Sequence, residues 1–188
     1  MTLATVNLTN HFLIAMPSMV DPNFSRTLTF ICEHNANGAL GVVVNRPSEI
    51  DLSTLFKQLD LNLPRRQLAK TPVLQGGPVH VDRGFVLHRP VGAWKSTLSV
   101  GERVGLTTSM DILEALGQGG GPDELLVTLG YSGWSAGQLE NEILQNAWLT
   151  VEAREDILFD MDAEARLPAA MALLGVNYAT LTDTAGHA

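Results

Sequence analysis

Short runs of apolar and β-branched residues recur along the first half of the chain, and their length predicts strands. Residues 28–33 and 39–45 form two such runs around Asn35-Ala36-Asn37-Gly38. Because an Asn-Gly pair supplies the positive φ that a tight reversal needs, these runs predict a β-hairpin. Residues two apart on a strand share a face, so we expect Cys32 and His34 to point the same way.

Further apolar runs predict strands at 12–16, 73–75, 104–107, 125–129, 148–151 and 157–159, with 104–107 at a sheet edge. Val81 and residues 85–88 flank Asp82-Arg83-Gly84, which predicts a second hairpin with Gly84 in the left-handed conformation. Residues 130–134 are expected to turn out of the strand at 125–129. We expect both hairpins to contribute to one central sheet.

Apolar residues recur at helical spacing in four segments, 52–59, 110–116, 138–144 and 163–174. Asp51 or Ser53 is expected to cap the first helix, and Pro168 fits the last helix only within its first turn. We expect the first and last of these helices to pack outside the sheet. Neither a repeat nor a linker divides the chain, so the sequence predicts a single α+β domain over 1–188.

Charge and cysteine content narrow the functional classes. The chain has 12 basic and 20 acidic residues, and this net charge of −8 repels phosphate backbones, so we expect no direct nucleic-acid binding. The apolar runs are shorter than the roughly 20 residues that span a bilayer, so we expect no membrane segment. A single cysteine cannot form an internal disulfide, and the first basic residue is Arg26, so we expect a cytoplasmic protein without a signal peptide.

Cys32 and His34 admit two chemical interpretations. They could act as a thiolate and its base, or they could bind zinc together with His88. A lone cysteine in an apolar strand is more often a small buried hydrophobe, and a nearby histidine more often satisfies a backbone carbonyl. A structural zinc site needs four ligands, so we predict no metal and no other cofactor. We expect Cys32 to be a packed thiol.

The segment Gly130-Tyr131-Ser132-Gly133-Trp134 is similar to the G-x-S-x-G nucleophile elbow, with Asp156 and His187 following in the order that hydrolases use. Trp134 departs from this motif, because an elbow needs small residues on both sides of the serine. A helix should also begin at once, whereas Gly137 delays it. The hydrolase interpretation is therefore weak.

Three turn segments contain residues that could bind an anion. Asn45, Arg46, Gly76, Gly77 and Arg83 would combine arginine forks with exposed backbone amides, which suit carboxylate or phosphate. The alternative is turn chemistry, in which glycines permit the turns and arginine binds loop carbonyls without any ligand. We favour turn chemistry.

Several segments together carry a family resemblance. They include Leu13-Ile14-Ala15-Met16-Pro17, Ile31-Cys32-Glu33-His34, Gly76-Gly77-Pro78-Val79, Gly84-Phe85-Val86-Leu87-His88, the segment 130–134, and Gly186-His187-Ala188. In this order they resemble the AlgH/YqgE family of bacterial proteins over nearly the whole chain. The resemblance implies an α+β fold in which a mixed, branched, barrel-like sheet is surrounded by helices. It implies no agreed biochemical activity, and the family name implies a regulatory role in alginate synthesis.

Our leading hypothesis is a non-catalytic, transcription-linked regulatory or scaffold protein that acts through a protein partner or a small-molecule ligand. The alternative is a cysteine-dependent enzyme or redox sensor that uses Cys32 and His34. Reaction of the thiol at neutral pH would distinguish the two hypotheses. The sequence leaves the partner and the oligomeric state open, a homodimer included.

Overall fold

The hairpin predicted at Asn37-Gly38 is present and forms part of the central sheet. The computed structural model describes residues 7–181. Its strands are β1 (His11–Ala15), β2 (Leu28–Asn35), β3 (Gly38–Val43), β4 (Pro47–Asp51), β5 (Pro72–Gln75), β6 (Val79–Arg89), β7 (Thr97–Val100), β8 (Val104–Thr107), β9 (Glu124–Ser135) and β10 (Trp148–Glu152). Ten strands form one sheet, whose main path runs β10-β1-β2-β3-β9-β6-β8-β7.

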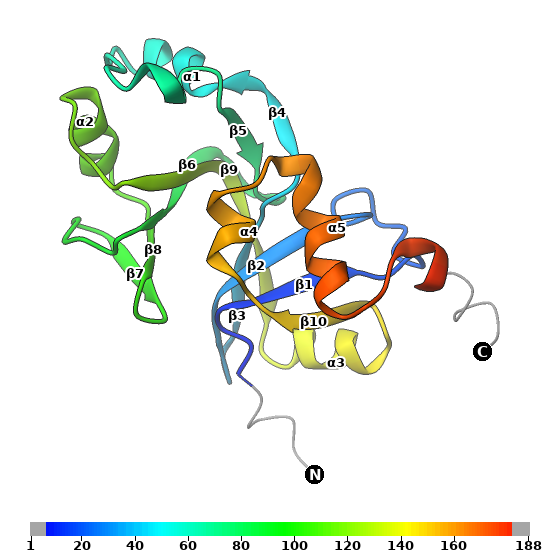
Figure 1. Ribbon diagram of the computed structural model, residues 1–188. Helices are drawn as coiled ribbons and strands as arrows, with labels where there is room; N and C mark the ends of the chain where they lie inside the picture. Colours follow the sequence, from blue (N-terminus) through cyan, green and yellow to red (C-terminus); the bar gives the residue numbers. More distant parts are fainter. Residues whose placement is uncertain (1–6, 182–188) are drawn as a thin grey trace.

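The sheet branches at β9. One edge of this strand pairs antiparallel with β6, while the other edge pairs first with β5, in parallel, and then with β3, antiparallel. β4 extends the branch by pairing with β5. The domain is therefore a single α+β domain with a mixed, branched sheet that curls into a half-barrel, which confirms the predicted fold class (Figure 1).

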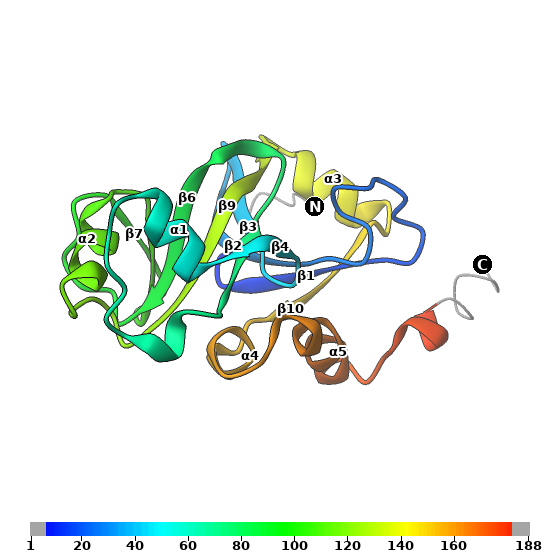
Figure 2. The ribbon, with the colours of Figure 1, turned by 90° about the horizontal axis from the view of Figure 1, so that it is seen from above.

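The helices are α1 (Leu52–Gln58), the 3₁₀ turn η2 (Arg66–Leu68), α2 (Asp111–Gly117), α3 (Gln138–Leu144), α4 (Glu155–Phe159) and α5 (Ala163–Leu173). The Asp51 carboxylate caps α1 by accepting a hydrogen bond from the backbone N–H of Thr54 at 2.9 Å. Figure 2 shows α4 and α5 on one side of β1 and β10 and α3 on the other. Within residues 7–181, no helix is both long and apolar enough to cross a membrane.

Three buried clusters hold these layers together. The inner core joins the strands to α4 and α5 and includes Phe12, Phe30, Leu87, Leu158, Leu167 and Met171. A second cluster packs α1 and α2 on the opposite face of β6 and β9, through residues such as Phe56, Val86 and Leu116. The third, the α3 core, contains Leu13, Ile31, Trp134, Leu139 and Trp148. Burial of both faces explains why many strands read as continuous apolar runs.

Several predicted elements were wrong. Residues 79–89 form one long strand, β6, and its register against β9 shifts between Val79 and Gly84, so there is no second hairpin. Strand 104–107 is β8, which lies between β6 and β7 and is not an edge strand. Residues 157–159 belong to α4 and not to a strand. The negative charges of Glu155 and Asp156 in its first turn interact favourably with the helix dipole and stabilise the helix. Pro168 lies inside α5 and not in its first turn.

Candidate functional site

A β-bulge separates the two residues of the proposed thiolate and base pair. The pairing of β2 with β3 shifts between Ile31 and Glu33, so Cys32 is an extra residue on β2. Cys32 therefore faces the inner core, whereas His34 pairs with Ala39 and faces the α3 core. The expectation that Cys32 and His34 share a face was wrong, because the bulge reverses the alternation.

Cys32 is 1% exposed, as expected for a packed thiol. Its Sγ lies 3.8 Å from the carbonyl oxygen of Phe30. Burial, with a smaller contribution from the charge of Glu33, raises the pKa of the thiol. The protonated thiol is a poor nucleophile, so this environment suits a structural residue.

His34 is buried, and its side chain connects the amino-terminal segment to α3 by hydrogen bonds. Its Nδ1 accepts a hydrogen bond from the backbone N–H of Leu8, and its Nε2 lies 3.0 Å from Oε1 of Glu140. Because Nδ1 is an acceptor here, the proton lies on Nε2, which donates to Glu140. His34 therefore has partners at both ring nitrogens, and none of them is Cys32.

His88 is fully buried and also has partners at both ring nitrogens. Its Nδ1 donates to the carbonyl of Pro90 at 2.9 Å, and its Nε2 lies 2.7 Å from the hydroxyl of Thr107. Burial lowers the pKa of His88, against the opposing effect of its bond to Pro90. Within residues 7–181, no three His, Cys, Asp or Glu side chains lie close enough together to hold a metal ion.

Ser132 lies within β9 and does not form a nucleophile elbow. Residues 130–134 continue the strand to Ser135, so the prediction that they turn out of it was wrong. The Ser132 hydroxyl is buried and donates to the carbonyl of Gly76 at 3.1 Å. Asp156 instead pairs with Arg154 on the surface, and His187 lies outside the described residues.

The candidate anion-binding residues mostly serve the turns. Asn45 accepts from the backbone N–H of Leu28 and donates to the carbonyl of Arg26. The Arg46 guanidinium donates to two loop carbonyls, at 2.8 and 2.7 Å. Gly76 and Gly77 pass so close to β9 that a Cβ on Gly77 would lie 2.2 Å from the Tyr131 carbonyl oxygen.

Only part of this predicted set lines a common cavity. Arg46 and Gly77 line a small cavity of about 240 Å³ together with the exposed Val81. Asn45, Gly76 and Arg83 are not among its lining residues, and Arg83 is exposed. These contacts are what turn chemistry requires, so they supply little evidence for an anion site.

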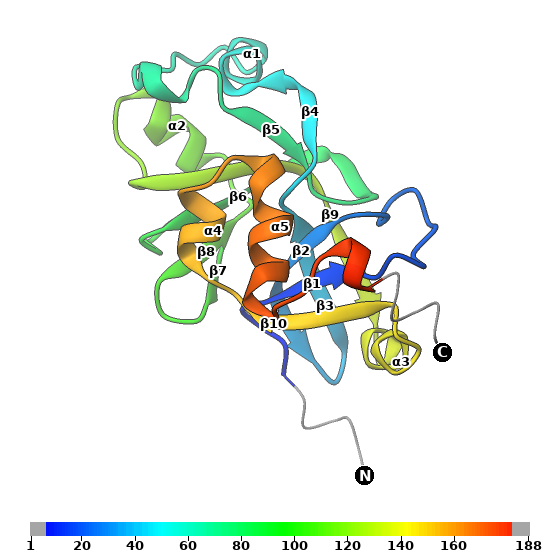
Figure 3. The same ribbon diagram turned by 45° about the vertical axis from the view of Figure 1, so that its right-hand side comes forward.

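A larger cavity lies elsewhere, among residues that the sequence did not predict to lie together. Its volume is about 660 Å³, within the range of small-molecule sites. Its walls come from η2 and β5, from the start of β9, and from the turn between α4 and α5. Figure 3 shows the connection between α4 and α5 close to β5. Apolar residues, among them Leu68, Leu126, Phe159 and Met161, line the cavity together with several charged ones.

Arg166 is the unusual residue of this cavity. It is 6% exposed, and its Nη1 donates to the Val44 carbonyl at 2.6 Å. Its Nε is buried without a hydrogen-bond partner, and among residues 7–181 no carboxylate forms an ion pair with it. Burial lowers the pKa of Arg166 to about 10, despite the charges of Asp162 and Glu164, so the guanidinium remains a cation at neutral pH.

The sequence contains a signal for this residue. The buried positions of α5 are Ala163, Arg166, Leu167, Ala170 and Met171, which follow the spacing of one helix face. Arg166 is the charged member of that apolar face. A buried charge is costly unless it has a partner, so an arginine at a core position indicates either a structural ion pair or a ligand contact.

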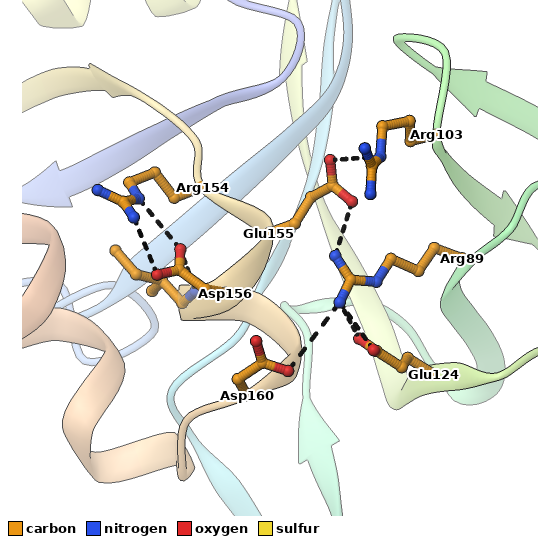
Figure 4. Close-up of polar contacts among 8 residues, drawn as sticks. Arg89, Arg103, Glu124, Arg154, Glu155, Asp156 and Asp160 are labelled. Carbon is orange, nitrogen blue, oxygen red and sulfur yellow. Dashed lines mark hydrogen bonds and ion pairs between the residues drawn. The ribbon is translucent and has the colours of Figure 1, made fainter.

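An ionic cluster borders the cavity (Figure 4). Nη2 of Arg89 lies 2.6 Å from a carboxylate oxygen of Glu124, and its Nη1 lies 2.8 Å from Glu155. Arg103 contacts the other oxygen of Glu155 at 3.2 Å. Pairing with Glu124 and Glu155 raises the pKa of Arg89. Glu124 also lines the cavity, so the cluster connects β6 and α4 at its border.

Comparisons with known proteins agree with this architecture. A family model described as AlgH-like matches residues 12–179. A UPF0301 protein of Thiobacillus denitrificans is 61% identical over 99% of this chain and 100% of its own length. A UPF0301 protein of Dechloromonas aromatica is 58% identical over 97% and 98% of the two chains. Neither name states a biochemical activity.

Two solved structures are similar as well. The solution structure of the AlgH protein from Pseudomonas aeruginosa is 49% identical, with a TM-score of 0.79 over 97% of this chain and 96% of that one. A crystal structure of a Corynebacterium diphtheriae protein, 19% identical, shares the fold with a TM-score of 0.63 over 82% and 81% of the chains. The chain belongs to the AlgH-like family, as its sequence resemblance predicted.

Proposed function

We propose that this protein is a regulatory protein that binds a small ligand in the cavity between η2–β5, β9 and the α4–α5 turn. The observation that carries the proposal is Arg166, a buried cation on the cavity wall whose Nε has no partner. A binding site is typically concave and mostly apolar, with a few polar groups that orient the ligand. Arg166 beside Leu126, Phe159 and Met161 has this character.

The setting of the cavity supports a regulatory role. Its walls come from the β5 branch, from β9 and from α4–α5, so a bound molecule would contact elements that are far apart in the chain. A ligand that contacts several elements can shift the balance between their arrangements, provided that it binds one arrangement more tightly. The regulatory sense of the AlgH name is consistent with such a role.

The proposed location is the cytoplasm, because a lone buried thiol without a disulfide partner suits a reducing compartment. A cysteine-dependent enzyme or redox sensor has less support. Cys32 is buried, its thiol pKa is raised, and its neighbour His34 faces the opposite side of the sheet.

Blocking the cavity tests the proposal. Thr71 lines it and is half-buried, so Thr71→Trp should place an indole in the space. Ser99→Trp, at an exposed position of β7, is the matched control. Both variants and the wild type would be screened by thermal shift against amino acids, carboxylic acids, nucleotides and sugar phosphates at millimolar concentration.

We expect at least one compound class to raise the Tm of the wild type and of Ser99→Trp but not of Thr71→Trp, because a ligand stabilises the state that binds it. Circular dichroism would establish that both variants are folded. Equal shifts in all three proteins, or no shift with any class, would contradict the proposal.

A further inference from the structure

The free edge of the Arg166 guanidinium determines which ligand groups it can bind. Nη1 is occupied by the Val44 carbonyl, while the buried Nε has no partner. Nε–H and Nη2–H point in the same direction along one side of a guanidinium, and together they match two oxygens of a carboxylate or phosphate. This edge therefore suits an oxyanion that binds through two parallel hydrogen bonds.

The other charges of the cavity distinguish between oxyanions. Besides Arg166, the lining contains the basic residues Arg65 and Lys70 and the acidic residues Asp123, Glu124, Asp160, Asp162 and Glu164. Arg65 is already engaged, since its guanidinium donates to the carbonyls of Pro122 and Asp123. Glu124 is paired with Arg89, whose Nη2 also lies 4.0 Å from Asp160. Within residues 7–181, Asp123, Asp162 and Glu164 form no ion pair, and their charges would repel a doubly charged phosphate or a nucleotide.

A ligand with one negative and one positive group fits this distribution. Its anion would meet Arg166, its cation would face the acidic residues, and an apolar body would lie against Leu126, Phe159 and Met161. The volume of about 660 Å³ accommodates a molecule of the size of an amino acid or a dipeptide.

We infer that the cavity binds a small zwitterion of the amino-acid type, with its carboxylate held by Nε–H and Nη2–H of Arg166 and its ammonium group facing the carboxylates of the α4–α5 turn. This inference rests on the proposed function, because it names the ligand class of the same cavity. Arg166 is then a ligand-binding residue, and ligand binding explains why a charged side chain lies on the buried face of α5.

Heteronuclear NMR of the arginine Nε–Hε groups in the wild-type protein tests the contact directly. The four probes are leucine, leucinamide, isocaproate and inorganic phosphate. Leucinamide lacks the carboxylate of leucine, and isocaproate lacks its amine. We expect leucine to shift the Arg166 Nε–Hε signal with saturation, and leucinamide and phosphate to leave it unchanged. Isocaproate should bind roughly tenfold more weakly or worse, because it loses one charged contact.

Variants supply a second measurement. Arg166→Lys keeps the charge but loses the planar fork, and Arg166→Gln loses both, so each should weaken leucine binding by roughly tenfold to a hundredfold. Arg46→Gln removes an arginine that also binds loop carbonyls but does not line this cavity, and it should leave binding unchanged. Because Arg166 also donates a hydrogen bond to Val44, its replacement could unfold the protein. In that case the NMR titration of the wild-type protein alone tests the inference.

The possible failures are distinct. Equal binding of leucine and leucinamide, a shift of the Arg166 signal by phosphate, or leucine binding that leaves this signal unchanged would overturn the zwitterion inference. The inference would also fail if none of these probes bound, while another compound class raised the Tm of the wild type but not of Thr71→Trp. In that case the proposed function would stand. If no compound class stabilised the protein, both would fail.

Discussion

Glu142 of α3 accepts hydrogen bonds from two buried indoles, and its removal should strongly destabilise the domain. Its Oε1 lies 3.0 Å from Nε1 of Trp134 and 2.9 Å from Nε1 of Trp148. The tryptophans are 6% and 3% exposed, and their rings meet edge to face at 6.1 Å. Oε2 accepts a further bond from Gln138 at 2.9 Å. One carboxylate therefore satisfies both buried indole donors.

The size of the effect follows from these bonds. Glu142→Ala leaves two buried N–H groups without an acceptor, and each such group costs about 1–3 kcal/mol. Glu142 is half-buried, so water can reach part of the site, and we expect a loss of about 2–4 kcal/mol in the free energy of unfolding. Glu142→Gln keeps an acceptor oxygen but loses the charge, so we expect a loss of about 1 kcal/mol.

Urea denaturation followed by far-UV circular dichroism measures both losses, and it does not depend on the fluorescence of the altered tryptophan site. Asn141→Ala is the control, because Asn141 is an exposed neighbour on the same helix. It should change the free energy of unfolding by less than about 0.5 kcal/mol. A Glu142→Ala variant as stable as this control, or less destabilised than Glu142→Gln, would refute the reasoning.

Three further predictions concern single groups and net charge. At pH 7, iodoacetamide should label Cys32 slowly in the native protein and rapidly after unfolding, and native labelling at the rate of a free thiol would restore the enzyme or redox alternative. The folded-state pKa of His88 is lowered, so the unfolded state binds more protons below about pH 6.5 and stability should fall as the pH decreases, by at most about 1.4 kcal/mol per unit. His88→Gln should reduce the change of the free energy of unfolding with pH, measured by urea denaturation at several pH values. An unchanged pH dependence would contradict its assignment to His88. With a net charge of −8, the protein should not shift random duplex DNA in a gel at physiological salt, and tight, salt-sensitive binding would exclude this prediction.

The sequence by itself determined the elements whose signals are local. Ala36 and Asn37 form the turn between β2 and β3, and Gly38 begins β3 with a positive φ of 135°, so residues at the reversal itself set it. Asp51 capped α1, and the predicted helix at 138–144 coincides with α3. The resemblance carried by several short segments in one order led to the fold class and to the family.

Tertiary structure decided the features that depend on distant partners. The sequence predicts a turn that begins at Gly130, but β9 continues through this residue. A Cβ at this glycine would lie 2.4 Å from the Gly77 carbonyl oxygen, so the residue permits a close approach of two segments. The bulge at Cys32 is likewise a mismatch between β2 and β3, and strand alternation within β2 could not reveal it.

The cavity is the feature of this protein that depends most on the tertiary structure. Its walls come from segments around residues 65–74, 123–126 and 159–166, and no local pattern indicates that these segments meet. The sequence did place a charged residue on the apolar face of α5, which is a readable signal. Whether Arg166 would meet a carboxylate or be left with an unpartnered Nε depended on the packing of α5 against the sheet, because burial and pairing are properties of the folded chain and not of one helix.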